Sequence, residues 1–135
     1  MHFTFVGIQR LGMAKKGEKN SVVEQCPIRN IVSRFGTKWS LLVIVTLDEN
    51  GATRFGQLGK LIPDISSKML ASTLHVLEAD GLVGRKVYPE VPIRVEYELT
   101  DMGQSLMPLI RSLTEWALAH QETILAYRRD FDGSK

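Results

Sequence analysis

The stretch from residue 65 to residue 99 constrains the fold of this 135-residue chain more than any other part of it. Its first half predicts a helix over residues 67–80, because Ser66 or Ser67 can cap the start and Gly81 stands where a left-handed residue would end it. Leucines gather on one face of this helix, and the opposite face carries polar and basic groups: Lys68, Ser72 and His75. The pattern predicts a helix that packs on one side and presents polar and basic side chains on the other.

Two short β-prone runs follow this helix, over residues 82–88 and 94–99. The segment Pro-Glu-Val-Pro joins them and is too stiff to continue either strand. The two runs therefore predict a β-hairpin directly after the helix. A helix followed by such a hairpin is a helix-and-wing unit, an arrangement that suggests DNA binding.

The residues before this unit predict three more helical segments. Pro27 begins the first, since proline is favoured in the first turn, and Thr37 caps the second, where we expect Trp39 at the centre of the core. Residues 54–62 predict a short helix that Pro63 ends. Short helix, tight turn and longer helix make a helix-turn-helix, so the predicted fold is mainly α with a small β-hairpin wing (α+β).

The last predicted helix starts at Thr100 and carries more apolar surface than a terminal helix needs for its own small domain. We therefore expect it to bind a partner chain through one row of side chains: Leu106, Leu109, Leu113 and Trp116. The expected organisation is a flexible arm over residues 1–25, a winged helix-turn-helix over 26–100 and a C-terminal dimerisation helix over 101–130. Met13 would also serve as a start, which makes residues 1–12 a candidate upstream extension.

Composition narrows the class of protein. The formal net charge of +2 is too small to argue for nucleic acid by itself, so any DNA affinity must come from local placement of charge. No apolar run approaches the roughly 20 residues of a membrane span, and the single cysteine fits a reducing, cytoplasmic compartment. The three histidines are scattered without a ligand pattern, so we expect no metal site, no cofactor and no enzymatic activity.

Several separate motifs resemble those of the HxlR-type family of prokaryotic winged helix-turn-helix regulators. They span about residues 26–120 and include Cys26-Pro-Ile, Gly36-Thr-Lys-Trp39, Ile65-Ser-Ser-Lys-Met-Leu70, Leu77-Glu-Ala-Asp-Gly-Leu-Val83 and Val95-Glu-Tyr-Glu-Leu-Thr100. The resemblance implies a transcriptional regulator that binds double-stranded operator DNA as a homodimer through paired terminal helices. In some members of that family, a cysteine at the place of Cys26 senses oxidants or electrophiles.

The candidate DNA contacts fall into three groups, each with a simpler alternative. Base and phosphate reading is assigned to Ser67, Lys68, Ser72 and His75, which are otherwise an ordinary solvated helix face. The wing supplies Arg85, Lys86 and Arg94, which can instead pair with Glu96 or Glu98 across the hairpin. Thr37 and Lys38 stand at a helix start that can hold a phosphate, although capping alone explains Thr37, and Arg54 is either a phosphate contact or part of an ion pair.

Cys26 stands just before the proline that opens the first helical segment, where unpaired backbone N–H groups favour a thiolate. Two interpretations stay open: a sensor for a small-molecule oxidant or electrophile, and a small residue that only caps and packs. The function of the whole chain also has an alternative, a winged-helix protein–protein interaction module without direct DNA binding. The salt dependence of binding distinguishes these two functions. DNA binding that neutralises phosphates weakens steeply as the salt concentration rises, whereas an apolar protein contact should not.

Overall fold

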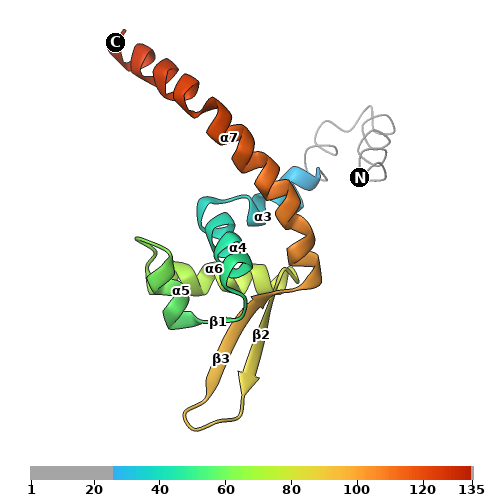
Figure 1. Ribbon diagram of the computed structural model, residues 1–135. Coiled ribbons are helices and arrows are strands. Elements are labelled where there is room, and N and C mark those ends of the chain that lie inside the picture. Colours follow the sequence, from blue (N-terminus) through green and yellow to red (C-terminus); the bar gives the residue numbers. More distant parts are fainter. Residues whose placement is uncertain (1–25, 135) are drawn as a thin grey trace, which may run out of the picture.

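The computed structural model describes residues 26–134, which form a winged helix-turn-helix with a long C-terminal helix. Figure 1 shows the central helices above the sheet, the hairpin projecting to one side and the last helix leaving on the other. The predicted fold class is confirmed, and the arm predicted for residues 1–25 lies outside the described residues. In chain order the elements are η1 (Ile28–Val32), α3 (Ser33–Phe35), α4 (Lys38–Asn50), β1 (Thr53–Arg54), α5 (Phe55–Leu61), α6 (Ser67–Ala79), β2 (Val83–Tyr88), β3 (Arg94–Leu99) and α7 (Asp101–Gly133).

Short polar side chains cap the three longer helices as the sequence predicts. The hydroxyl of Thr37 accepts the Ser40 N–H at 3.2 Å at the start of α4. Ser66 accepts the Met69 N–H at 3.0 Å at the start of α6. At the start of α7, the Thr100 hydroxyl accepts the N–H of Gly103 at 3.0 Å. These bonds satisfy backbone donors that have no partner within the helix.

Helix α6 ends in a Schellman motif. The Leu82 N–H donates to the Leu77 carbonyl at 2.9 Å, and the Gly81 N–H donates to the Glu78 carbonyl at 3.1 Å. Gly81 has a φ of 77°, a left-handed conformation that glycine adopts without steric cost. The predicted role of Gly81 is confirmed, and Asp80 is the C-cap residue rather than the last helical one.

The sheet has three antiparallel strands in the order β1-β3-β2. Strands β2 and β3 form the predicted hairpin, with Val83 opposite Leu99 and Tyr88 opposite Arg94. Strand β1 was not predicted: the sequence places Arg54 in the short helix, whereas it pairs with Glu96 of β3 and is the N-cap of α5. A strand of two residues is too short to show the alternation by which strands are recognised.

The core lies between α4, α6, the base of the sheet and the first turns of α7. Its fully buried members on α4 are Val43, Ile44 and Leu47, and α6 contributes Leu70, Leu74 and Leu77. The expectation that Trp39 is the centre of this core is wrong. Trp39 is half-buried at the first turn of α4, its ring covered by the Lys38 ammonium at 4.4 Å from the ring centroid, because α4 buries its inner turns instead.

The first helical segment differs from the regular helix that the spacing after Pro27 predicts. Residues 28–32 form a π-helix, and neither η1 nor α3 contains a buried residue. Ile28 and Ile31 are 67% and 58% exposed, although Phe35 packs partly against the core. The wider π-helical turn changes the angular spacing of side chains, which explains why a 3.6-residue pattern misplaces this apolar face.

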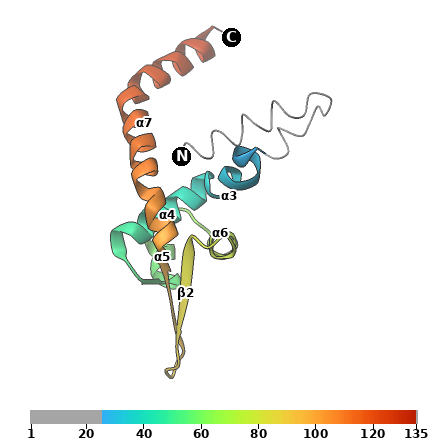
Figure 2. The same cartoon turned by 90° about the vertical axis from the view of Figure 1, so that its right-hand side faces the viewer.

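Helix α7 is continuous over 33 residues and passes through Pro108. Its buried residues lie in the first three turns: Gly103, Met107 and Ile110. Beyond them the helix leaves the domain, and Figure 2 shows that it bends along its length. Most of its surface therefore lacks a packing partner within residues 26–134.

Candidate nucleic-acid interface

Helix α6 presents the polar face that the sequence predicts. Ser67, Lys68, Ser72 and His75 are all exposed, whereas the leucines of the opposite face are buried in the core. Lys68 forms no ion pair with any residue of the described range 26–134. Its ammonium group is therefore available to an external anion.

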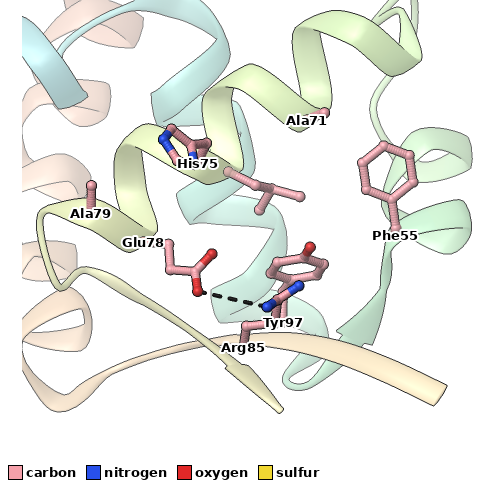
Figure 3. Close-up of a pocket in the computed structure, with 8 residues that line it drawn as sticks. Phe55, Ala71, His75, Glu78, Ala79, Arg85 and Tyr97 are labelled. Carbon is pink, nitrogen blue, oxygen red and sulfur yellow. Dashed lines mark ion pairs between the residues drawn. The ribbon is translucent and has the colours of Figure 1, made fainter. Parts of the chain in front are cut away.

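A hollow of about 570 Å³ lies beside this face, between α6, the start of α5 and the sheet. Figure 3 shows Glu78 of α6 and Arg85 of β2 pointing toward one another across it, with a Glu78–Arg85 ion pair of 3.7 Å. The remaining lining residues are Phe55, Ala71, Leu74, His75, Ala79 and Tyr97. The hollow thus places an arginine of the wing close to the polar face of the helix.

The other two wing cations contact acids of the hairpin. Lys86 lies 3.6 Å from Glu98, and Arg94 lies 2.9 Å from Glu90 and 3.8 Å from Glu96. The cross-hairpin alternative therefore describes a contact that exists for Lys86 alone among the wing cations: the acids that contact Arg94 lie in the loop and in its own strand, and Arg85 pairs with α6 instead. Exposed pairs such as Lys86–Glu98 are worth about 0–1 kcal/mol, so a phosphate can replace them at small cost.

Arg94 is the most enclosed of these cations. Its guanidinium stacks on the Tyr88 ring at 3.9 Å from the ring centroid, and its side chain is 30% exposed. Its Nε atom is buried without a hydrogen-bond partner in the described part of the chain. Arg94 is thus held by the hairpin, with less than a third of its side chain exposed.

The start of α4 offers less than the sequence suggests. The Thr37 hydroxyl is engaged as the helix cap, and the Lys38 ammonium lies over the Trp39 ring. Arg54, for which a phosphate contact and an ion pair were both open, is exposed and forms no ion pair with residues 26–134.

Sequence reasoning missed the partner of Asp80 at the end of α6. The Arg34 Nε atom of α3 donates a hydrogen bond to the Asp80 carboxylate at 2.5 Å. That hydrogen bond, together with the negative charge of Asp80, raises the pKa of Arg34 above its ordinary value. The two residues are 46 positions apart, and no local pattern in the sequence links them. Both acids at the C-terminal end of α6 are therefore paired with an arginine.

Cys26 lies where the sequence places it, immediately before the first helical segment. Its backbone carbonyl accepts the N–H groups of Arg29 at 3.0 Å and Asn30 at 3.1 Å, so the chain enters its first turn there. The thiol is free, and the residue is half-buried.

Within residues 26–134, no three or more His, Cys, Asp and Glu side chains cluster in a way that could hold a metal ion. None of the described helices is long and apolar enough to cross a membrane.

The exposed helix face, the wing beside it and the long terminal helix define a regulator of the helix-turn-helix type. The chain belongs to the HxlR-like helix-turn-helix family, whose model matches residues 34–124. It is 45% identical over 100 residues to an HTH-type transcriptional regulator of Methanothermobacter thermautotrophicus, covering 72% of this chain and 76% of that protein.

Two solved structures are similar in fold and sequence. The redox regulator HypR in its reduced form has a TM-score of 0.69 and 34% identity, covering 75% of this chain and 99% of HypR. The reduced transcriptional regulator YodB from Bacillus subtilis has a TM-score of 0.62 and 38% identity, covering 69% of this chain and 92% of YodB. The predicted family is thereby confirmed, and the chain is a transcriptional regulator.

Proposed function

We propose that this protein binds double-stranded operator DNA as a homodimer, with α6 of each subunit in the major groove. The observation that carries the proposal is the division of α6 into a buried leucine face and an exposed face with Lys68 free of ion pairs in the described chain. A recognition helix reads base edges with such a face, mostly from its N-terminal residues.

The exposed side chains suit different parts of the DNA. Ser67, Lys68, Ser72 and His75 can donate to base acceptors or phosphates in the groove. Arg85, Lys86 and Arg94 would exchange their weak carboxylate partners for phosphates of the flanking backbone. The contacts with the flanking phosphates would fix the position and orientation of the protein, and the contacts with bases would supply sequence preference.

The proposed dimer contact is the apolar row of α7. Leu109, Leu113 and Trp116 are each more than half exposed, and Leu106 lies partly in the core of its own subunit. A two-fold pair joined through these helices would present two reading helices about 34 Å apart, one turn of DNA. The operator is then expected to be a palindrome or nearly so.

Shift assays with DNA from upstream of the protein's own gene test this function. We expect a discrete shift. The logarithm of the binding constant should fall steeply and linearly with the logarithm of the salt concentration, because Lys and Arg side chains of the protein displace counterions from the phosphates. A random duplex of equal length serves as the control and should bind more weakly. Absence of a shift at low salt on every fragment would favour the protein–protein interaction module instead.

We also propose that Cys26 makes operator binding responsive to oxidants or electrophiles. The similar protein HypR is a redox regulator, and the structure of YodB is also known after diamide treatment. With one cysteine per chain, the reaction must be an intersubunit disulfide, a mixed disulfide with a small thiol, or alkylation. In the disulfide case, diamide takes up the two electrons and two protons that the two thiols release.

The test compares the wild type with Cys26→Ser. Diamide or a quinone should lower operator affinity of the wild type and leave the variant unchanged, and a reducing thiol should reverse the diamide effect. If both proteins respond alike, or if neither responds, Cys26 only caps and packs.

A further inference from the structure

One ion pair joins the start of the described chain to the end of the reading helix. Arg34 in α3 contacts Asp80, the C-cap residue of α6, through the 2.5 Å hydrogen bond described above. Within residues 26–134, this is the only ion pair between the η1–α3 segment and any other element. The contact therefore links two elements that are distant in sequence.

The position of Asp80 gives this contact a particular value. A carboxylate at the C-terminal end of a helix faces the negative end of the helix dipole, which is unfavourable. The guanidinium of Arg34 offsets this repulsion, and it does so at the residue where α6 turns toward the wing. Asp80 also donates its own N–H to the Val76 carbonyl at 3.1 Å, so its place affects the last turn of the helix.

The backbone of Arg34 is anchored to α4 by a second, separate contact. Its carbonyl accepts a hydrogen bond from the hydroxyl of Ser40 at 3.2 Å, and Ser40 is buried in α4. The next residue, Phe35, packs partly against the core. The backbone of Arg34 is therefore bound to α4, and its side chain is bound to the end of α6.

Among residues 26–134, the rest of this segment is not closely packed, because neither η1 nor α3 contains a buried residue. A hollow of about 420 Å³ separates it from the first turns of α7, lined mainly by Ile31, Phe35, Leu82, Met102 and Leu106. Asp80 also borders this hollow. The Arg34–Asp80 contact therefore crosses the edge of this hollow and joins α3 to the end of α6 by a direct hydrogen bond.

We propose that Arg34 is a positioning residue for DNA reading, which holds the C-terminal end of α6 so that its exposed face meets the groove at a fixed angle. The inference rests on the proposed DNA-binding function. Arg34 itself makes no DNA contact in this proposal and acts through Asp80. Removing either partner should therefore impair reading in the same way.

The opposite charges of the two residues make a sharp test. Arg34→Met removes a positive charge and Asp80→Ala removes a negative one, so bulk attraction to DNA predicts opposite changes in affinity. Positioning predicts that both variants lose operator affinity, by about 3- to 10-fold, and that the double variant loses no more than either single one. Affinity for a random duplex should change little. Any small change should follow the charge removed, weaker binding for Arg34→Met and tighter binding for Asp80→Ala.

Two further variants complete the set. Arg29→Met removes an equal charge from the same segment without breaking the contact, and it should keep wild-type operator affinity. The exchanged pair Arg34→Glu with Asp80→Arg should recover most of the loss. Tighter operator binding by Asp80→Ala, or failure of the exchanged pair to improve on Arg34→Met, would overturn the assignment.

Amide hydrogen exchange on the full-length protein without DNA gives an independent readout. Loss of the contact should raise exchange in the last turn of α6 and the residues that cap it, residues 76–82, in Arg34→Met and Asp80→Ala but not in Arg29→Met. If the wild type binds no operator, the proposed function fails, and this measurement alone decides whether the contact holds the C-terminal end of α6. Equal exchange in all four proteins would then refute it.

Discussion

Lys68 is the side chain on which DNA affinity should depend most directly. It lies in the first turn of α6, is exposed and has no ion-pair partner in the described chain. We expect Lys68→Ala to weaken operator binding by about 1–3 kcal/mol and to lower the salt slope by about one, with little change in unfolding free energy.

The measurement is a salt series of operator titrations, and Arg129→Ala is its control. Arg129 is an equally exposed cation near the end of α7, far along the chain from the reading helix. Its removal should leave the operator affinity close to that of the wild type. An unchanged affinity in both Lys68→Ala and Arg94→Ala would show that this face does not read DNA.

Gly103 is a residue for which the structure predicts a stability effect. A Cβ built there would lie 2.2 Å from the Leu82 carbonyl oxygen, a backbone atom that cannot move freely. Gly103→Ala should lower the free energy of unfolding by about 1–3 kcal/mol. Urea denaturation at fixed protein concentration checks this. Gly56→Ala is the matched control, because its Cβ meets nothing within 4 Å and alanine favours the helix.

The wing and α6 are coupled as elements through Glu78 and Arg85. Both side chains are a little less than half exposed, and their 3.7 Å pair keeps the arginine beside an acid that repels DNA. Glu78→Gln should therefore tighten operator binding by about 2- to 5-fold at low salt, and Arg85→Ala should weaken it by a similar factor. Titrations at low and high salt measure both effects. Equal affinities for the two variants would exclude Arg85 as a phosphate contact.

Local signals predicted the elements well. Capping residues such as Ser66 and Thr100, together with Gly81 as the terminator, fix the helix boundaries because each acts within a few residues of its partner. Tertiary context decides the features that were missed. The pairing of β1 with β3 and the shallow position of Trp39 depend on how separate elements pack, which no local pattern records.

The same distinction applies to the candidate site. The exposed face with Lys68 and His75 follows from helical periodicity alone, so sequence reasoning found it. The Arg34–Asp80 and Glu78–Arg85 pairs bring together residues of different elements, and complementary charges elsewhere in the chain would fit equally well. These pairs form only because folding brings the separate elements together.

At the scale of the whole molecule, the exposed apolar side chains of α7 are the proposed contact with a partner chain. Exposed Leu113 and Trp116 lie on one side of the helix, and exposed Leu118 lies on another. Leu113→Glu with Trp116→Glu should give a monomer that loses operator affinity by at least about 100-fold, because paired reading is lost. Leu118→Glu is the control and should remain a dimer. Sedimentation measures the mass.

These substitutions are preferable to shortening the chain after Gln104. Met107 and Ile110 are buried in the core, so that truncation would unfold the domain whether or not α7 forms a dimer. A double-glutamate variant that stays dimeric and binds the operator would place the subunit contact elsewhere.

The hydroxyl of Thr100 connects the end of α6 with the start of α7. It donates to the Gly81 carbonyl at 2.6 Å and accepts from the Gly103 N–H, so it fastens the end of the reading helix to the base of α7. At a rise of about 1.5 Å per residue, Trp116 lies about 22 Å from this joint, so a tilt of about 9° moves the proposed subunit contact by roughly 3.4 Å, the rise of one base pair. In the proposed dimer, the stiffness of this joint, together with the burial of Met107 and Ile110, would then decide whether an operator with one extra base pair between its half-sites is accepted or refused.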